Sequence, residues 1–268
     1  SMLMRAIWGS DAGNVYFCGD DYPYDGGLWR WNGNSIAKIP SVRGRCNHVA
    51  GASANNVWVR WDNVAQENPA LHFRFDGAQW IKTTTLWNGV IPIDATTSFG
   101  FAGIYNGSRT IGHMTFSEAI SGQTAVSQSN LPVGCPSSAF PAPSAVGNAF
   151  GPNDVWAKLG DSCIMHWDGV AWTKVQPSGL GNLGEVHGSA TNDMWAVGNG
   201  TCPIAHWNGQ AWSASCAGLP AAERSVYGVY GAPDGKAWAV IPSGVTNDLH
   251  GVTAGGTNDL WACGDKGT

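Results

Sequence analysis

Two short stretches decide the fold: GSATNDMW at Gly188–Trp195 and HWNGQAW at His206–Trp212. In the first, an Asn-Asp pair precedes an apolar residue and a Trp, which is typical of a turn that enters a strand. In the second, an Asn-Gly pair separates two Trp positions. Asn-Gly is a strong hairpin signal, because glycine adopts a positive φ freely and asparagine tolerates it. The stretches therefore predict two consecutive β-hairpins, the second closed by a two-residue turn.

Both stretches recur along the chain. Variants of the first are GSDAGNVY (9–16), GASANNVW (51–58), GPNDVW (151–156), GAPDGKAW (231–238) and GGTNDLW (255–261). Turn glycines of the second stand at Gly33, Gly77, Gly169 and Gly209, with a weaker copy at Gly122, so the intervals are 44, 45, 47 and 40 residues. Four short strands in about 40–45 residues, repeated along the chain, are typical of a β-propeller blade.

We therefore expect one all-β domain over residues 1–268, a β-propeller of four-stranded antiparallel blades. The expected blades span residues 3–42, 45–88, 89–133, 145–179, 183–220 and 225–268. The end of the chain leaves an alternative, because Trp238 and Trp261 are too close for a full blade between them. Six blades result if residues 225–268 form one blade, and this count is favoured. Seven result if two blades are each incomplete.

These motifs resemble the Asp-box, or BNR-like, propeller repeats of secreted proteins from myxobacteria and related Gram-negative bacteria. The stretch Gly9–Tyr16 comes nearest to the sialidase Asp box, with Gly where that motif has Ser. The resemblance implies a secreted β-propeller and leaves its activity open. Sialidase catalysis needs three arginines around the axis. Only Arg5 lies near a predicted inner strand, so sialidase activity is not expected.

Composition excludes several classes of function. The net charge is −5 and no run of five basic residues occurs, which argues against binding to nucleic acid or an anionic membrane. No apolar run approaches the 18 residues of a membrane-spanning helix. Few lysines with much Asn, Gly, Ser and Trp indicate an exported protein. No nucleophile-elbow, phosphate-loop or dinucleotide-binding motif occurs.

The repeated Trp residues are expected to pack between blades, since each buries a large apolar area. Aromatic residues outside the repeat are better candidates for stacking on a sugar. We expect a ligand to contact Trp61, Trp87, Tyr22, Tyr24 and Trp29. The residue before each hairpin aromatic is Arg30, Arg74, His166 or His206. It is read either as an outward polar residue or as part of one ligand pocket in each blade.

The inner strands surround the axis and could gather a metal site. Alignment on the first glycine of each repeat places Arg5, Asn47, Gly184, Tyr227 and His250 in one column. A divalent metal such as Zn or Ca would be held by His48, His187, His250, Glu185 and Asp94. No cofactor is favoured, because these residues do not share one column and are better interpreted as polar residues that line a water-filled channel.

The seven cysteines indicate disulfides. Cys202 and Cys216 flank one hairpin, so a bond between them is predicted, with Cys163 as the alternative partner of Cys202. Cys18 and Cys263 occupy equivalent positions in the first and last repeats. Equivalent positions in neighbouring blades lie beyond the reach of a disulfide.

The sequence therefore predicts a secreted or cell-surface, non-catalytic propeller that binds a carbohydrate or protein ligand through loops on one face. The alternative is a metal-dependent hydrolase of lactones or phosphoesters with its site at the axis. The last blade lacks a His-Trp-Asn-Gly hairpin. Because an open sheet edge pairs readily with another chain, a homodimer through that edge is also expected.

Overall fold

The computed structural model shows an all-β protein, since every regular element in the described residues is a strand. The structure describes residues 2–21, 26–62, 71–83, 87–105, 108–116, 123–135, 146–161, 163–217, 219, 225–232, 236–240, 249–256 and 259–264. The weaker turn copy predicted at Gly122 lies outside these residues.

Five sheets contain four antiparallel strands each, taken consecutively from the chain. The first two are β1 (Met2–Asp11), β2 (Asn14–Asp21), β3 (Gly27–Trp31), β4 (Ile36–Arg43), and β5 (Arg45–Ser53), β6 (Asn56–Asp62), β7 (Leu71–Phe75), β8 (Trp80–Thr83). The third is β9 (Trp87–Pro92), β10 (Thr97–Tyr105), β11 (Ser108–Phe116), β12 (Gln123–Asn130). The last two are β13 (Val146–Gly151), β14 (Asp154–Leu159), β15 (Cys163–Trp167), β16 (Trp172–Lys174), and β17 (Leu183–Ala190), β18 (Asp193–Gly198), β19 (Ile204–Trp207), β20 (Trp212–Ala214).

The region from residue 225 onward is organised differently. Its described residues form two separate two-stranded sheets. One is β21 (Gly228–Gly231) with β22 (Ala237–Val240), and the other is β23 (Leu249–Gly256) with β24 (Asp259–Gly264). The six-blade prediction expected one four-stranded sheet here. In the described residues, the last two copies of the first motif instead lie in two separate sheets. Neither sheet has a third or a fourth strand within this part of the chain.

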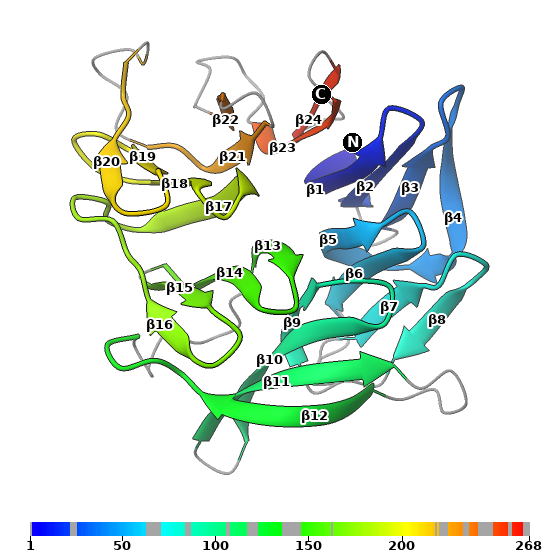
Figure 1. Ribbon diagram of the computed structural model, residues 1–268. Coiled ribbons are helices and arrows are strands. Elements are labelled where there is room, and N and C mark those ends of the chain that lie inside the picture. Colours follow the sequence, from blue (N-terminus) through cyan, green and yellow to red (C-terminus); the bar gives the residue numbers. More distant parts are fainter. Residues whose placement is uncertain are drawn as a thin grey trace.

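The sheets stand around a central axis, each with its first strand innermost (Figure 1). Strands β1, β5, β9, β13, β17, β21 and β23 pack successively against one another, and β23 packs against β1. The last described sheet therefore lies beside the first. This arrangement confirms the β-propeller and the four-stranded antiparallel blades predicted from the repeats.

The hairpin turns differ from the two-residue prediction. Trp207 pairs with Trp212, so the loop contains four residues. The side-chain oxygen of Asn208 accepts hydrogen bonds from the backbone N–H of Gln210 and of Ala211, each at 3.0 Å. This local side-chain bond favours the longer loop. The predicted positive φ of the turn glycines is confirmed at Gly33, Gly77, Gly169 and Gly209.

The core lies between neighbouring sheets rather than in one central mass. Trp156 in β14 is 1% exposed and meets Trp212 of the next sheet edge-on, with ring centroids 6.1 Å apart. Trp58 in β6 is also 1% exposed. The structure thus confirms that the repeated aromatic residues pack the blades together, as their large apolar area demands.

Three disulfides add covalent links. They join Cys18 to Cys46, Cys135 to Cys163, and Cys202 to Cys216. The predicted bond between Cys202 and Cys216 is confirmed, with Cα atoms 5.7 Å apart. The alternative that paired Cys163 with Cys202 is wrong. Cys263 is a buried free thiol, in agreement with the expectation that it lies out of reach of Cys18.

Candidate functional site

The same irregularity occurs near the start of several innermost strands. The pairing of β1 with β2 skips Arg5, that of β5 with β6 skips Asn47, and that of β23 with β24 skips His250. In β17, both Gly184 and Glu185 are skipped. Such β-bulges re-aim a side chain that regular pairing would fix. Four of the five residues in the column predicted from the repeat alignment thus lie at bulges, and the fifth, Tyr227, directly precedes β21.

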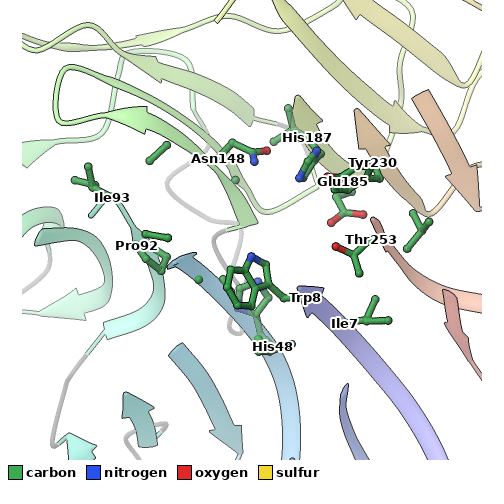
Figure 2. Close-up of a pocket in the computed structure, with 18 residues that line it drawn as sticks. Ile7, Trp8, His48, Pro92, Ile93, Asn148, Glu185, His187, Tyr230 and Thr253 are labelled. Carbon is green, nitrogen blue, oxygen red and sulfur yellow. The ribbon is translucent and has the colours of Figure 1, made fainter. Parts of the chain in front are cut away.

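Two cavities of about 170 and 190 Å³ lie along the axis. The smaller is lined by residues such as Trp8, Asn148, His187 and Tyr230, toward the later part of the inner strands (Figure 2). The larger is lined by the bulge residues, among them Arg5 and Asn47. The two cavities share five lining residues: Ile7, His48, Val49, Glu185 and Val252. The shared residues therefore stand between the two cavities.

Glu185 joins the last four-stranded sheet to the first two-stranded one. Its Oε2 accepts a hydrogen bond from the backbone N–H of Val229 in β21 at 3.0 Å. Burial raises the pKa of this carboxyl to about 7, although the Val229 bond and the charge of Lys158 oppose the rise. Lys158 donates to the carbonyl oxygen of Gly184 at 2.8 Å. The carboxyl is thus held in place while half-buried at the cavity wall.

His187 is held on two sides. Its Nδ1 accepts a hydrogen bond from the backbone N–H of Gly231 at 3.1 Å, so the ring proton sits on Nε2. The ring lies near that of Tyr230, with centroids 4.5 Å apart, and the Tyr230 hydroxyl donates to the carbonyl oxygen of Ala254. Burial lowers the pKa of His187 to about 4. At neutral pH this imidazole is therefore a neutral hydrogen-bond donor.

His48 belongs to a row across the second sheet. It pairs with Arg60 in β6, which pairs in turn with His72 in β7. Burial, with the charge of Arg60 as a second cause, lowers the pKa of His48 to about 4 and that of His72 to about 3. Both rings are therefore neutral at physiological pH, and His48 lines both axial cavities.

Trp8 supplies an aromatic surface beside these polar groups. Its ring lies against Gly51 so closely that a Cβ on that glycine would stand 2.5 Å from two ring carbons. The ring also stacks on Tyr16, with centroids 6.2 Å apart. Figure 2 shows Trp8 facing the same space as Glu185, His187 and Asn148. The cavity wall thus combines one aromatic ring with fixed donors and acceptors.

Sequence reasoning missed most of this column. In five of the repeats, the residues one position before the aligned glycine or alanine are Trp8, Ala50, His187, Tyr230 and Thr253, and all five line the smaller cavity. Only His187 was predicted as a site residue. The signal that could have found the others is their shared position, one residue before the glycine or alanine on which the internal repeats are aligned.

The predicted metal set is brought together only in part. His48, Glu185 and His187 line one cavity, whereas Asp94 does not. Asp94 is exposed in the turn after β9, where its Oδ1 accepts from the backbone N–H groups of Thr96 and Thr97. The backbone of His250 lies in β23, but its side chain is outside the described part. Among the described side chains, no group of three or more His, Cys, Asp or Glu could hold a metal ion.

Of the five predicted ligand aromatics, only Trp29 has a side chain within the described part of the structure. Trp29 lies in β3, packs against the apolar cluster between the first and last sheets, and has the Lys38 ammonium 5.3 Å from its ring centroid. Trp61 and Trp87 stand in β6 and β9, although the structure does not describe their side chains. Tyr22 and Tyr24 lie outside the described residues.

The hairpin residues Arg30, Arg74, His166 and His206 each bond to an Asn or Asp of their own blade, and Arg74 Nη2 also donates to the carbonyl oxygen of Ala95, in the turn after β9 of the neighbouring sheet, at 2.7 Å. Arg30 Nε donates to Asn14 at 2.8 Å, and Arg74 Nε donates to Asn56 at 3.0 Å. His166 and His206 each place Nε2 2.7 Å from a carboxylate oxygen, of Asp154 and Asp193 respectively. These four side chains therefore hold outer hairpins onto inner ones. The alternative, one ligand pocket in each blade, loses its support.

No helix in the described part of the chain is long and apolar enough to cross a membrane.

No protein-family model and no curated protein sequence matches the chain. The Asp-box resemblance therefore stays a prediction. Among solved structures, the chain is similar to YCF48 from Cyanidioschyzon merolae, at 11% identity and a TM-score of 0.62, covering 98% of this chain and 93% of that one. A streptogramin B lyase is similar at 12% identity and a TM-score of 0.61, with 97% and 91% covered. The SapL1 lectin in complex with alpha methyl fucoside is similar at 12% identity and a TM-score of 0.53, with 97% and 92% covered. At these identities the likeness shows the fold alone, and the fold is a β-propeller.

Proposed function

We propose that this protein is a secreted, non-catalytic β-propeller that binds a glycan, with a terminal sugar seated in the smaller axial cavity. The observation that carries the proposal is the wall shared by Trp8, Glu185 and His187. Sugars present an apolar ring face and several hydroxyl groups. An aromatic ring beside fixed donors and acceptors complements both features.

Each group has a role that follows from its contacts. The Trp8 ring offers the stacking face, the Nε2–H of His187 donates to a hydroxyl, and the free carboxyl oxygen of Glu185 accepts from another. Because Glu185 and His187 are already held by backbone N–H groups, and the Trp8 ring is held by packing on Gly51 and Tyr16, little ordering is needed when a ligand binds. The cavity of about 170 Å³ is smaller than sites for drug-sized ligands, and suits one sugar ring rather than a longer chain.

Two further observations support the proposal. Three disulfides suit an oxidising compartment outside the cytosol. The SapL1 lectin, which is similar in fold, was solved with alpha methyl fucoside. The site proposed here is axial, in place of the face-loop aromatics expected from the sequence.

A glycan array followed by calorimetry tests the proposal. We expect a glycan with a terminal sugar to bind, and Glu185→Gln to weaken binding about tenfold or more, because hydrogen bonds to charged groups contribute about 1.5–3 kcal/mol. Trp8→Ala should weaken it further. Asp168→Asn is the matched control, since Asp168 is exposed in a hairpin turn, lines neither cavity, and stands where another blade has Asn208. A blank array, or equal affinity for wild type and Glu185→Gln, would refute the proposal.

The alternative expectation, a metal-dependent hydrolase, is tested on the same preparations. Elemental analysis of protein purified without added metal should show no stoichiometric zinc or calcium. A stoichiometric metal that is lost in His48→Ala and His187→Ala would instead favour the hydrolase.

A further inference from the structure

The smaller axial cavity is lined by one repeated position of the inner strands. This position lies opposite the repeated aromatic residue of the second strand, as His187 lies opposite Trp195. Six inner strands contribute it to the wall, and the residues are Trp8, Ala50, Asn148, His187, Tyr230 and Thr253. In the third sheet, β9 contributes Pro92 at its end. The residue type at this position therefore determines the chemistry of each part of the wall.

The two halves of this wall differ in polarity. The strands β13, β17, β21 and β23 place polar side chains on it, namely Asn148, Glu185, His187, Tyr230 and Thr253. The strands β1, β5 and β9, with the residue that follows β9, supply apolar side chains, namely Ile7, Trp8, Val49, Ala50, Ala52, Pro92 and Ile93, beside the single imidazole of His48. Figure 2 shows Pro92 and Ile93 on the opposite side of the cavity from Glu185 and Thr253, with Trp8 between the two groups. The cavity is therefore polar at one end and apolar at the other.

The polar half is held by contacts between neighbouring blades. Asn148 Oδ1 accepts a hydrogen bond from the backbone N–H of Gly188 at 3.2 Å, so its amide nitrogen is left as a donor. His187 Nδ1 is engaged by Gly231 in the same way, which leaves Nε2–H as a donor. Glu185 keeps one carboxyl oxygen besides the one bound by a backbone N–H. Adjacent strands thus present fixed donors and an acceptor, which suits hydroxyl groups on neighbouring carbons of a sugar.

The apolar half has the opposite preference. Pro92 and Ile93 are buried, and neither side chain can donate or accept a hydrogen bond. Proline also lacks the backbone N–H that another residue would have at this place. A hydroxyl group placed against this wall would lose its water and find no side-chain partner there, which is unfavourable. A methyl group would be buried among apolar carbons, which is favourable. This wall therefore selects a ligand with one apolar end.

We propose that the smaller axial cavity selects a 6-deoxyhexose, a sugar with a methyl group where common hexoses have a hydroxymethyl group. This selectivity rests on the proposed glycan-binding function and adds the class of sugar to it. The pyranose ring lies on Trp8. Its methyl group, carried on C5, lies against Pro92 and Ile93. The hydroxyl groups on C2 and C3 face Glu185 and His187. Because C5 and C2 stand at opposite corners of the six-membered ring, one sugar satisfies both ends of the cavity.

An N-acetyl sugar also carries a methyl group but fits the cavity less well. Its methyl group belongs to the substituent on C2, which is next to the hydroxyl group on C3. The apolar and polar groups of such a sugar therefore share one edge of the ring, whereas the cavity has its apolar and polar walls on opposite sides (Figure 2). Tighter binding of N-acetyl sugars is accordingly an outcome that the test must distinguish.

Matched sugars that differ only at C6 provide the test. Calorimetry compares the methyl glycosides of 6-deoxygalactose and galactose, of 6-deoxymannose and mannose, and of 6-deoxyglucose and glucose, each in the D and the L form. We expect a 6-deoxy sugar to bind and its hydroxymethyl partner to bind about tenfold more weakly, because the additional hydroxyl group is buried without a partner. Glu185→Gln should weaken both members of a pair by the same factor, because Glu185 faces the other end of the sugar.

Two substitutions in the apolar half test the place of the methyl group. Pro92→Ser and Ala50→Ser each add one hydroxyl group to this wall. In either variant the preference for the 6-deoxy sugar should fall to about threefold or less, since the new hydroxyl group is a partner for the one on C6. Ala214→Ser is the matched control, because Ala214 is exposed in β20 and lines neither cavity. Thermal unfolding of each variant is recorded, and Ala50→Ser provides the test if Pro92→Ser does not fold.

The outcomes separate the selectivity for a 6-deoxy sugar from the proposed function. Equal affinities within every pair, tighter binding of the hydroxymethyl partner, or tighter binding of an N-acetyl sugar would overturn the selectivity and leave glycan binding standing. A wild-type preference in both serine variants would show that the methyl group does not lie against this wall, and would overturn the proposal as well. Absence of binding by every sugar, on the array and in calorimetry, would overturn both the selectivity and the proposed function.

Discussion

The sheet β17–β20 and the sheet β23–β24 begin in the same way and end differently. Both start with an inner strand that bulges near its first residues. In both, the sequence Thr-Asn-Asp leads to a second strand whose third residue is a Trp. In β17–β20 an outer hairpin then covers the first and supplies His206 to Asp193. In β23–β24 the described residues supply no cover, and Leu260 is 43% exposed.

The comparison shows that each blade consists of two separable hairpins. The inner hairpin forms the ring and lines the axis, and β23–β24 keeps this register although the described residues include no outer hairpin for it. The outer hairpin buries the apolar residue and the acceptor of the inner one. Three predictions test this division, in order of decreasing effect.

The aromatic residue of a covered hairpin should matter most. Trp156 is 1% exposed, so Trp156→Ala should lower the free energy of unfolding by about 3–5 kcal/mol. Trp238, in the uncovered hairpin β21–β22, is 44% exposed, so Trp238→Ala should cost about 1 kcal/mol. Urea unfolding of both variants measures the difference. Equal losses would contradict the idea that outer hairpins determine this burial.

The acceptor position gives the second test. Asp193→Ala removes the partner of His206 and should cost about 1.5–3 kcal/mol. Asp259→Ala removes a carboxylate whose Oδ2 is buried without a hydrogen-bond partner among the described residues, so the protein should change by less than about 0.5 kcal/mol or become more stable. Thermal unfolding under identical conditions compares the two. A large loss for Asp259→Ala would mean that this carboxylate is already satisfied in solution.

The third test uses Glu185, whose carboxyl links the complete sheet β17–β20 to strand β21 of the first two-stranded sheet. Its folded pKa is about 7 against an ordinary 4.5, so folding favours the protonated form. The stability that this provides is present below pH 4.5 and is lost as pH rises from 4.5 to 7. Glu185→Gln should therefore gain up to about 2 kcal/mol over wild type between pH 5 and pH 8.

The two axial histidines act in the opposite direction. His48 and His187 have folded pKa values of about 4 against 6.5, so their contribution is present above pH 6.5 and is lost as pH falls toward 4. Wild type and Glu185→Gln both contain these histidines and lose the same stability at low pH. The difference between their two stability profiles therefore reports on Glu185 alone. Parallel profiles of the two proteins at pH 5–8 would show that Glu185 is already charged in the folded protein.

The repeats carry enough local information to predict hairpins, blades and the axial column. Glycine turns and the repeated aromatics act locally, so Gly33 and Trp58 could be interpreted without a structure. Asp94 could not, because the third blade lacks the repeat that would align it, and β9 ends at Pro92, before that residue. Trp29 is expected in a loop from the sequence, but it lies inside β3, which begins two residues earlier at Gly27.

The division of residues 225–268 into two sheets could not be predicted from the local sequence either. The distance between Trp238 and Trp261 along the chain allows either a single blade or two partial ones. The outcome depends on which inner strand each hairpin packs against. In the structure β21 packs on β17, and β23 packs on both β21 and β1, which are contacts between distant segments.

The bulges of the inner strands have a consequence for how this channel could change during evolution. A bulged residue takes no part in the strand pairing, so the register of the strands does not depend on which side chain it carries. Arg5, Asn47 and His250 occupy the same place with three different chemistries, while the pairing on either side is maintained. The fold thus provides positions around the axis at which the residue type differs between blades while the strand register is kept.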